Sequence, residues 1–149
     1  MEEKRYNVTA VKDRLNSYRE NARDIDNEIE RLERLISKMS GVGAQVISDM
    51  VAEKEELDEK IRTEIQEQAD EWKSIEGLLA NLKHSDEKAV IRMRYHDRES
   101  WGMVTRLMFG SKDDFVGKED TYLRRVHKIH GSALLNMAKL LEDGDPNTA

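Results

Sequence analysis

The chain has 149 residues, of which 38% are hydrophobic and 38% are charged, and its formal net charge is −6 at pH 7. It contains no cysteine, one proline and eight glycines, which excludes disulfides and thiolate metal sites and favours long helices. No stretch approaches the roughly 20 apolar residues of a membrane span, so we expect none. The charged start has no apolar run behind it, so we also expect no signal peptide and a cytoplasmic protein.

Charge is distributed unevenly along the chain. Residues 1–83 hold 14 Lys and Arg against 20 Asp and Glu, whereas residues 84–141 hold 11 against 8. A basic segment in an acidic protein is a candidate site for an anionic partner. We therefore predict a scaffold at 1–83, a functional domain at 84–141 and a flexible tail at 142–149.

The first apolar run, from Val8 to Met39, repeats at alternating intervals of 3 and 4 residues. A stripe this narrow needs a partner helix, because an apolar seam is not stable in water. Two glycines at 40–43 then supply a turn, and a second run follows from Met50 to Leu82 with one slip of register. We predict a long antiparallel helical hairpin (a coiled coil), which serves as scaffolding and either dimerises or packs onto the C-terminal helices.

Residues 84–141 predict three further helices, which makes the fold all-α. Ser85 is the expected N-cap of a short helix, which ends in the polar stretch 96–99. Ser100 is the expected N-cap of a second short helix at Trp101–Met108.

The third helix follows a polar loop at 112–120 that carries four acids. Asp120 or Thr121 is expected to cap this helix, which should reach about Leu141. Its apolar face is predicted to comprise Leu123, Val126, Ile129 or His130, Ala133, Met137 and Leu140. Another face carries the candidate DNA-binding residues Thr121, Arg124, Arg125, Lys128 and Ser132. Such a face suits phosphates and guanine edges in a major groove, although a solvated basic face has the same pattern.

Two strings resemble parts of sigma-factor region 4. Val90–Trp101 is similar to its start, in which an apolar helix ending in Arg-Tyr precedes a polar turn and a Ser-Trp helix start. Val126–Leu134 is similar to its recognition helix. With Ser48–Ala52, Glu55–Ile61 and the coiled helices, the chain resembles phage-encoded transcriptional regulators. These are grouped with the ArpU and RinA late-gene activators and occur in phages and prophages of Gram-positive bacteria.

The resemblance implies a cytoplasmic DNA-binding protein that controls late genes, such as those for packaging or lysis, through a sigma region 4-like helix-turn-helix. Ser100 and Trp101 would begin the supporting helix, and the basic residues Arg124, Arg125 and Lys128 would face double-stranded DNA. The residues that would seat the recognition helix are Val126, Ile129, Ala133 and Leu134. One departure is the linker before this helix, which has about ten residues where a helix-turn-helix has about 3–4.

The sequence carries no phosphate loop, nucleophile motif or zinc motif, so we expect neither an enzyme nor a bound cofactor. His127 and His130 lie three residues apart without an Asp, Glu or Cys partner at a useful spacing, which argues against a metal site. We expect His130 to pack or hydrogen-bond against the preceding helix. Trp72 and Trp101 are interpreted as anchors of the core or the seam.

Three hypotheses remain open. The leading one is a homodimeric transcription regulator that binds double-stranded DNA, with host RNA polymerase as a second partner. Another is a phage DNA-packaging component similar to a small terminase subunit. Assembly into a ring rather than a dimer would favour this hypothesis. The third is a coiled-coil protein-interaction module without DNA binding.

Overall fold

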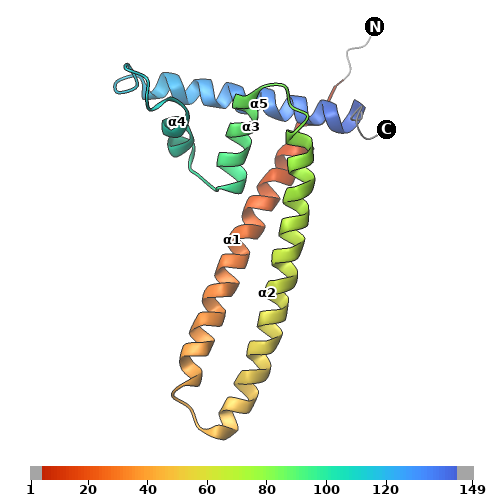
Figure 1. The fold of residues 1–149 in the computed structure, drawn as a ribbon, viewed down its shortest axis with the longest axis vertical. Helices are drawn as coiled ribbons and strands as arrows, with labels where there is room; N and C mark the ends of the chain where they lie inside the picture. Colours follow the sequence, from red (N-terminus) through yellow and green to blue (C-terminus); the bar gives the residue numbers. More distant parts are fainter. Residues whose placement is uncertain (1–4, 144–149) are drawn as a thin grey trace. The chain divides into compact units, whose positions relative to one another are not determined.

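The computed structural model describes residues 5–143, and every regular element in that range is a helix (Figure 1). In chain order these are α1 (Val8–Met39), α2 (Ala44–Leu79), α3 (Ser85–Ile91), the π-helical segment η1 (Arg92–His96), α4 (Trp101–Phe109) and α5 (Glu119–Asp143). The predicted all-α class is confirmed. The chain forms two compact units: one joins the residues up to Arg19 with those from Lys73 onward, and the other is Glu20–Trp72. The predicted division into folding domains stays a prediction.

The hairpin predicted from the apolar period is confirmed, because α1 and α2 pack antiparallel to each other (Figure 1). Asn7 caps α1, since its Oδ1 accepts a hydrogen bond from the Ala10 amide at 2.9 Å. At the other end of the hairpin, the Gly43 carbonyl accepts from the amides of Val46 and Ile47, both at 3.1 Å. The glycine turn therefore lies where the sequence predicts it.

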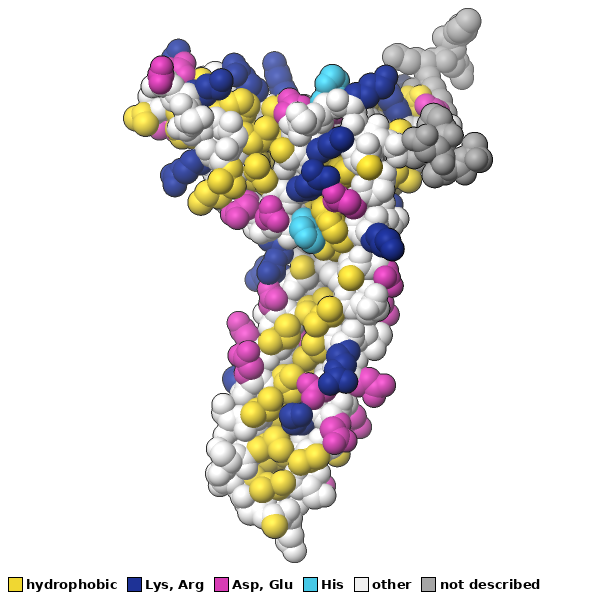
Figure 2. Space-filling view, in the orientation of Figure 1, with side chains coloured by type: hydrophobic (Ala, Val, Ile, Leu, Met, Phe, Trp, Pro, Cys, Tyr) yellow, Lys and Arg dark blue, Asp and Glu magenta, His cyan; other side chains and the backbone are white. Residues whose placement is uncertain are grey.

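In the unit Glu20–Trp72, the hairpin buries only part of its apolar surface. Ile25, Leu57 and Ile61 are buried between the two helices. The Lys60 ammonium lies 3.0 Å from the Glu28 carboxylate across the helix pair. Three large apolar side chains of this unit stay 46–51% exposed: Ile36, Val46 and Ile65. Hydrophobic side chains are accordingly visible along one face of the hairpin (Figure 2).

The other unit contains the larger core. Its α1 and α2 portions bury Val11, Leu15, Ile75 and Leu79. The three shorter helices meet at a cluster of fully buried valines, to which α3 contributes Val90, α4 contributes Val104 and α5 contributes Val126. Burying a side chain of this size contributes about 1.5 to 3 kcal/mol to folding, so this cluster fixes the three helices against one another.

The two starts predicted for α3 and α5 are wrong by one or two residues. α3 has His84 in the N-cap position, and no side chain caps it, so Ser85 is the first helical residue rather than the cap. α5 begins at Glu119, before the predicted caps Asp120 and Thr121. The reason is local: the Glu119 carboxylate reaches back to accept from the Gly117 amide at 2.9 Å.

α5 also extends beyond its predicted end at Leu141. Glu142 accepts a hydrogen bond from the Asn7 amide at 2.8 Å, and Asp143 accepts one from the Tyr6 hydroxyl at 2.7 Å. These bonds hold the last turn of α5 beside the start of α1. The flexible tail stays a prediction for residues 144–149, which lie outside the described residues.

A π-helical turn separates α3 from α4. The amide of Asp97 donates to the Arg92 carbonyl at 2.9 Å, five residues back, and the Glu99 amide donates to the Met93 carbonyl at 2.9 Å. Between them Arg98 has a φ of 59°, in the left-handed region that an L residue other than Gly, Asn or Asp rarely adopts. This residue redirects the chain into α4.

Gly110 ends α4 at a position where a side chain does not fit. A Cβ there would lie 2.4 Å from the Arg106 carbonyl oxygen, which is backbone and cannot simply turn away. We expect Gly110→Ala to lower the free energy of unfolding by about 1 to 2 kcal/mol, measured by urea denaturation. The matched control is Gly131→Ala inside α5, where a Cβ meets nothing within 4 Å. That control should instead raise stability by about 0.5 to 1 kcal/mol, and equal effects of the two changes would contradict the clash.

Candidate nucleic-acid interface

The helix α4 starts at the position that the sequence predicts. Ser100 is the N-cap of α4, and its hydroxyl oxygen accepts from the Met103 amide at 3.1 Å. The Thr105 hydroxyl, buried on the same helix, donates to the Trp101 carbonyl at 2.8 Å. Both bonds lie within α4 and its cap, and this helix contributes Val104 to the valine cluster.

The linker between α4 and α5 folds against the start of α5. The Tyr122 ring stacks on Phe109 at a centroid distance of 5.1 Å and lies 5.8 Å from the ring of Phe115. The Tyr122 hydroxyl donates to the Asp114 carboxylate, which raises the pKa of Tyr122 and lowers the pKa of Asp114. The Lys118 ammonium also lies 3.4 Å from the Asp114 carboxylate. The long linker is therefore attached to the start of α5 through Phe115 and Asp114, and two of its four acids have partners inside the loop and helix start.

All five sequence-predicted contact residues are exposed on α5. Successive residues of an α-helix are turned by about 100°, so Arg124 and Lys128 project within about 40° of each other. Both lie opposite the face that buries Val126 and Met137. Thr121 lies on the same exposed side. Arg124 Nε donates weakly to the Asp120 carbonyl at 3.4 Å, which leaves its Nη atoms directed away from this bond.

Arg125 and Ser132 lie nearer the edge of this surface. The Arg125 guanidinium stacks over the rings of Tyr122 and Phe109, at 5.1 and 5.5 Å from their centroids. A stacked guanidinium is attracted by both rings and is therefore less available to a partner. Helical spacing alone did not distinguish Arg125 from Arg124, because the ring of Phe109 comes from a different helix.

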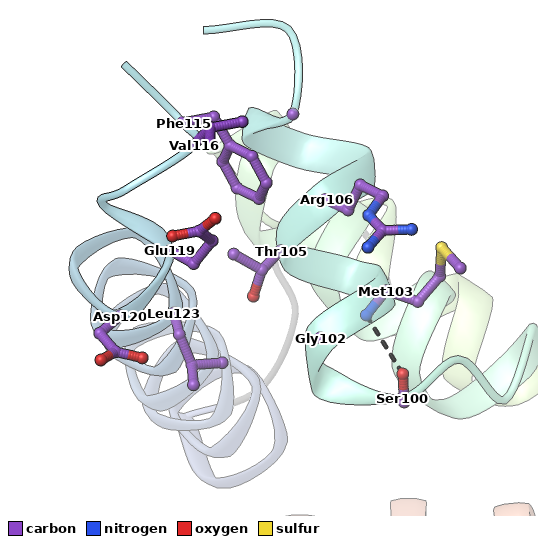
Figure 3. A pocket seen from close by; sticks show the side chains of 11 residues that line it. Ser100, Gly102, Met103, Thr105, Arg106, Phe115, Val116, Glu119, Asp120 and Leu123 are labelled. Atoms are coloured by element: carbon purple, nitrogen blue, oxygen red, sulfur yellow. Dashed lines mark hydrogen bonds between the residues drawn. The ribbon is translucent and has the colours of Figure 1, made fainter.

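A groove lies between α4 and the start of α5, with a volume of about 620 Å³ (Figure 3). α4 contributes Met103 and Arg106 to its lining, and α5 contributes Glu119 and Asp120. None of these four was predicted from the sequence to be a site residue. Arg106 was detectable as the lone cation of its helix, but only the fold brings the two carboxylates to the same groove. Their negative charge disfavours an anion in this groove, whereas Arg124 and Lys128 make the exposed side of α5 basic.

A buried polar pair holds α5 behind this surface. The Tyr95 hydroxyl lies 2.7 Å from His130 Nε2, and the Trp101 ring meets His130 edge-on at 4.7 Å. Burial lowers the pKa of His130 to about 4, with further repulsion from the positive charge of Lys12. Burial also raises the pKa of Tyr95 to about 12. The prediction that His130 packs or hydrogen-bonds against the preceding helix is confirmed by its contact with Trp101 of α4.

No helix in the described range 5–143 is long and apolar enough to cross a membrane. The same residues contain no group of three or more His, Asp or Glu side chains arranged to hold a metal ion. Comparisons with models of protein families, with curated proteins and with solved structures find no match to the chain.

Proposed function

We propose that the protein is a DNA-binding transcriptional regulator of phage or prophage late genes, which reads double-stranded DNA with the first half of α5. The observation that supports this most strongly is the side of α5 that presents Thr121, Arg124 and Lys128. This side is exposed, while the opposite side is buried against α3 and α4. An α-helix that is packed against other helices on one side and exposes basic residues on the other is the kind of element that enters a major groove.

The spacing of the two free cations suits this role. Arg124 and Lys128 are four residues apart, which is about 6 Å along the helix axis. Two cations at this separation can contact a phosphate and a neighbouring base edge, or two phosphates of one strand. The Ser100 cap and the short helix α4 place a second helix beside α5, as the sigma region 4-like helix-turn-helix of the resemblance requires.

The hairpin supports the proposal that the protein acts as a homodimer. Its exposed residues Ile36, Val46 and Ile65 lie on helices that also carry many charges, and an apolar seam of this kind is stabilised by a second helix pair. A dimer would present two copies of α5 to two half-sites on the DNA. Host RNA polymerase remains a second proposed partner.

The test is fluorescence anisotropy on fragments from the gene's own genomic neighbourhood, at two salt concentrations. Wild-type protein should bind one fragment tightly and lose affinity as the salt concentration rises, because phosphate contacts release counterions. Arg124→Ala and Lys128→Ala should each weaken binding by about 1 to 3 kcal/mol. Arg125→Ala should have a smaller effect, since this guanidinium is stacked on two rings.

Arg62→Ala is the charge-matched control, because Arg62 is an exposed cation in the other compact unit. Binding that is unchanged in both the Arg124 and the Lys128 variants would reject this surface of α5. An effect of Arg62→Ala equal to theirs would show that only net charge matters.

One observation favours a protein-interaction module as the second candidate. Val116, which is 87% exposed, lines the groove that contains Glu119 and Asp120, and Leu107 on α4 is 55% exposed. Apolar side chains beside carboxylates suit a protein partner with complementary chemistry better than they suit DNA. A wild-type protein that retains no DNA at low salt would favour this candidate over the first.

A further inference from the structure

Gly131 is the middle residue of α5, a helix of 25 residues that runs from Glu119 to Asp143. In the interior of a helix, glycine is less favourable than alanine, because it loses more conformational freedom when the chain folds. A glycine in this position therefore calls for a reason, which lies either in the packing of the protein or in a partner.

Neither the backbone nor the packing of the described residues requires a glycine at this position. The described residues with a positive φ are Arg98 and Gly117, so Gly131 has the helical backbone that any residue adopts. A Cβ on Gly131 would meet nothing within 4 Å. A Cβ on Gly77 also meets nothing, but Gly77 lies in the last turn of α2, where helices fray. The open space at Gly131 is therefore available to a partner.

Gly131 lies on the side of α5 that carries the proposed DNA contacts. It is exposed, and it follows Arg124 by seven residues, so the two project within about 20° of each other around the helix. Lys128, three residues before the glycine, is turned from it by about 60°, whereas buried Val126 is turned by about 140°. The glycine thus continues the surface that presents Arg124 and Lys128.

The position of Gly131 along the helix matches the width of a major groove. Seven residues rise by about 10 Å along the axis, and the groove is about 12 Å wide. A helix that lies across the groove with Arg124 inside it therefore meets a bordering strand near Gly131. Lys128 and Ser132, whose ammonium and hydroxyl groups can donate to phosphate, flank the glycine, and both are exposed.

We propose that the sugar–phosphate backbone of the bound DNA packs against α5 at Gly131, where the absence of a side chain permits a close approach. The proposal rests on the proposed function, because it takes the partner to be the same double-stranded DNA. Gly131 is then a positioning residue that sets how deeply the helix enters the groove, while Lys128 and Ser132 donate to the bordering phosphate. Contacts of this kind set the position of a protein on the duplex and carry no sequence information.

The test compares Gly131→Ala and Gly131→Leu with wild type by fluorescence anisotropy on the fragment that wild type prefers. Alanine and leucine both favour helices, so the thermal midpoint of each variant should rise by about 2 °C. Affinity should nevertheless fall, by about threefold for alanine and by about tenfold for leucine, because the added carbons push the DNA away from the helix. The preference for this fragment over a scrambled one should stay unchanged.

Two controls separate this contact from general effects of the substitution. Gly77→Ala changes another exposed helical glycine of the same compact unit, where a Cβ also meets nothing within 4 Å, and it should bind DNA as wild type does. Sedimentation velocity without DNA should give the same mass for wild type and for both Gly131 variants.

Four outcomes would overturn the close approach. Unchanged affinity in both Gly131 variants would reject it while leaving the role of Arg124 and Lys128 intact. An equal loss in Gly77→Ala would assign the effect to the replacement of a helical glycine in general. A changed mass of the Gly131 variants without DNA would assign this surface to a second copy of the chain. Failure of wild-type protein to bind any DNA at low salt would reject the proposed function, and the close approach with it.

Discussion

Lowering the pH from 7 to 5 is expected to reduce the free energy of unfolding by about 2 kcal/mol through His130 alone. The pKa of this histidine is lowered from 6.5 to about 4 in the folded protein, chiefly because burial disfavours the charged ring. Only 7% of the residue is exposed. The unfolded chain therefore takes up a proton near pH 6.5, whereas the folded protein takes it up only near pH 4.

The sign follows from this difference in proton binding. Between pH 6.5 and about 4 the unfolded state holds more protons, so stability decreases as the pH falls through this window. Near pH 4 the full contribution of His130, about 3 kcal/mol, has been lost. Above pH 7 the contribution is complete and constant.

Among the described residues, the charged groups that act on His130 include no acid that would oppose this effect. Tyr95 of η1 supplies a hydroxyl and Trp101 of α4 supplies a ring edge. The charged groups that act on it are Lys12 of α1, Arg94 of η1 and His127 of α5 itself, and each disfavours a second positive charge. An imidazolium at position 130 would be repelled by positive charges on α1, on η1 and on α5 itself.

Urea denaturation at pH 7 and at pH 5, with wild type and His130→Gln, measures the contribution. Glutamine does not titrate, and its amide oxygen can accept the bond from the Tyr95 hydroxyl. The pH-dependent loss in this variant should be smaller than that of wild type by about 2 kcal/mol. Identical losses in the two proteins would show that His130 is not the group responsible.

The elements that follow from local sequence were predictable. The apolar period of α1 and the glycine turn depend on residues within one or two helical turns, so the hairpin could be predicted from the sequence alone. The Ser100 cap could be predicted for the same reason, because its bond to the Met103 amide spans three residues. Exposure of Arg124 and Lys128 followed from the helical repeat of α5.

The features that depend on contacts between distant segments were not predictable. Glu87 lies in the first turn of α3, yet it is only 3% exposed, and its carboxylate is bound by Asn136, 49 residues away. The stacking of Arg125 on Phe109 and the approach of Arg19 to Arg94 likewise join separate helices. Periodicity assigns a residue to a face, but it does not identify what that face meets.

Asn136→Ala is expected to lower the free energy of unfolding by about 3 kcal/mol. Asn136 Nδ2 donates to both carboxylate oxygens of Glu87, at 2.6 and 3.2 Å, and so joins α5 to α3. When the Asn136 amide is removed, the Glu87 carboxylate stays shielded from water, because the residue is only 3% exposed, but it loses its hydrogen-bond donor. Glu87→Gln should cost less, about 1 kcal/mol, because a neutral amide is less costly to bury and can still accept one bond.

A double-mutant cycle separates the interaction from the loss of packing. Glu87→Leu and Asn136→Leu are each expected to destabilise the protein, whereas the double variant removes both polar groups together and should recover about 1.5 to 3 kcal/mol of the summed loss. Additive single effects would contradict a direct bond between the two side chains. Since Asn136 is half-buried and lies more than two helical turns beyond Lys128 along α5, Asn136→Ala should leave the proposed DNA affinity unchanged at temperatures where the variant is fully folded. Loss of affinity in a folded Asn136 variant would mean instead that the Glu87 contact sets the orientation of α5 for binding, which distinguishes an orienting role from a purely stabilising one.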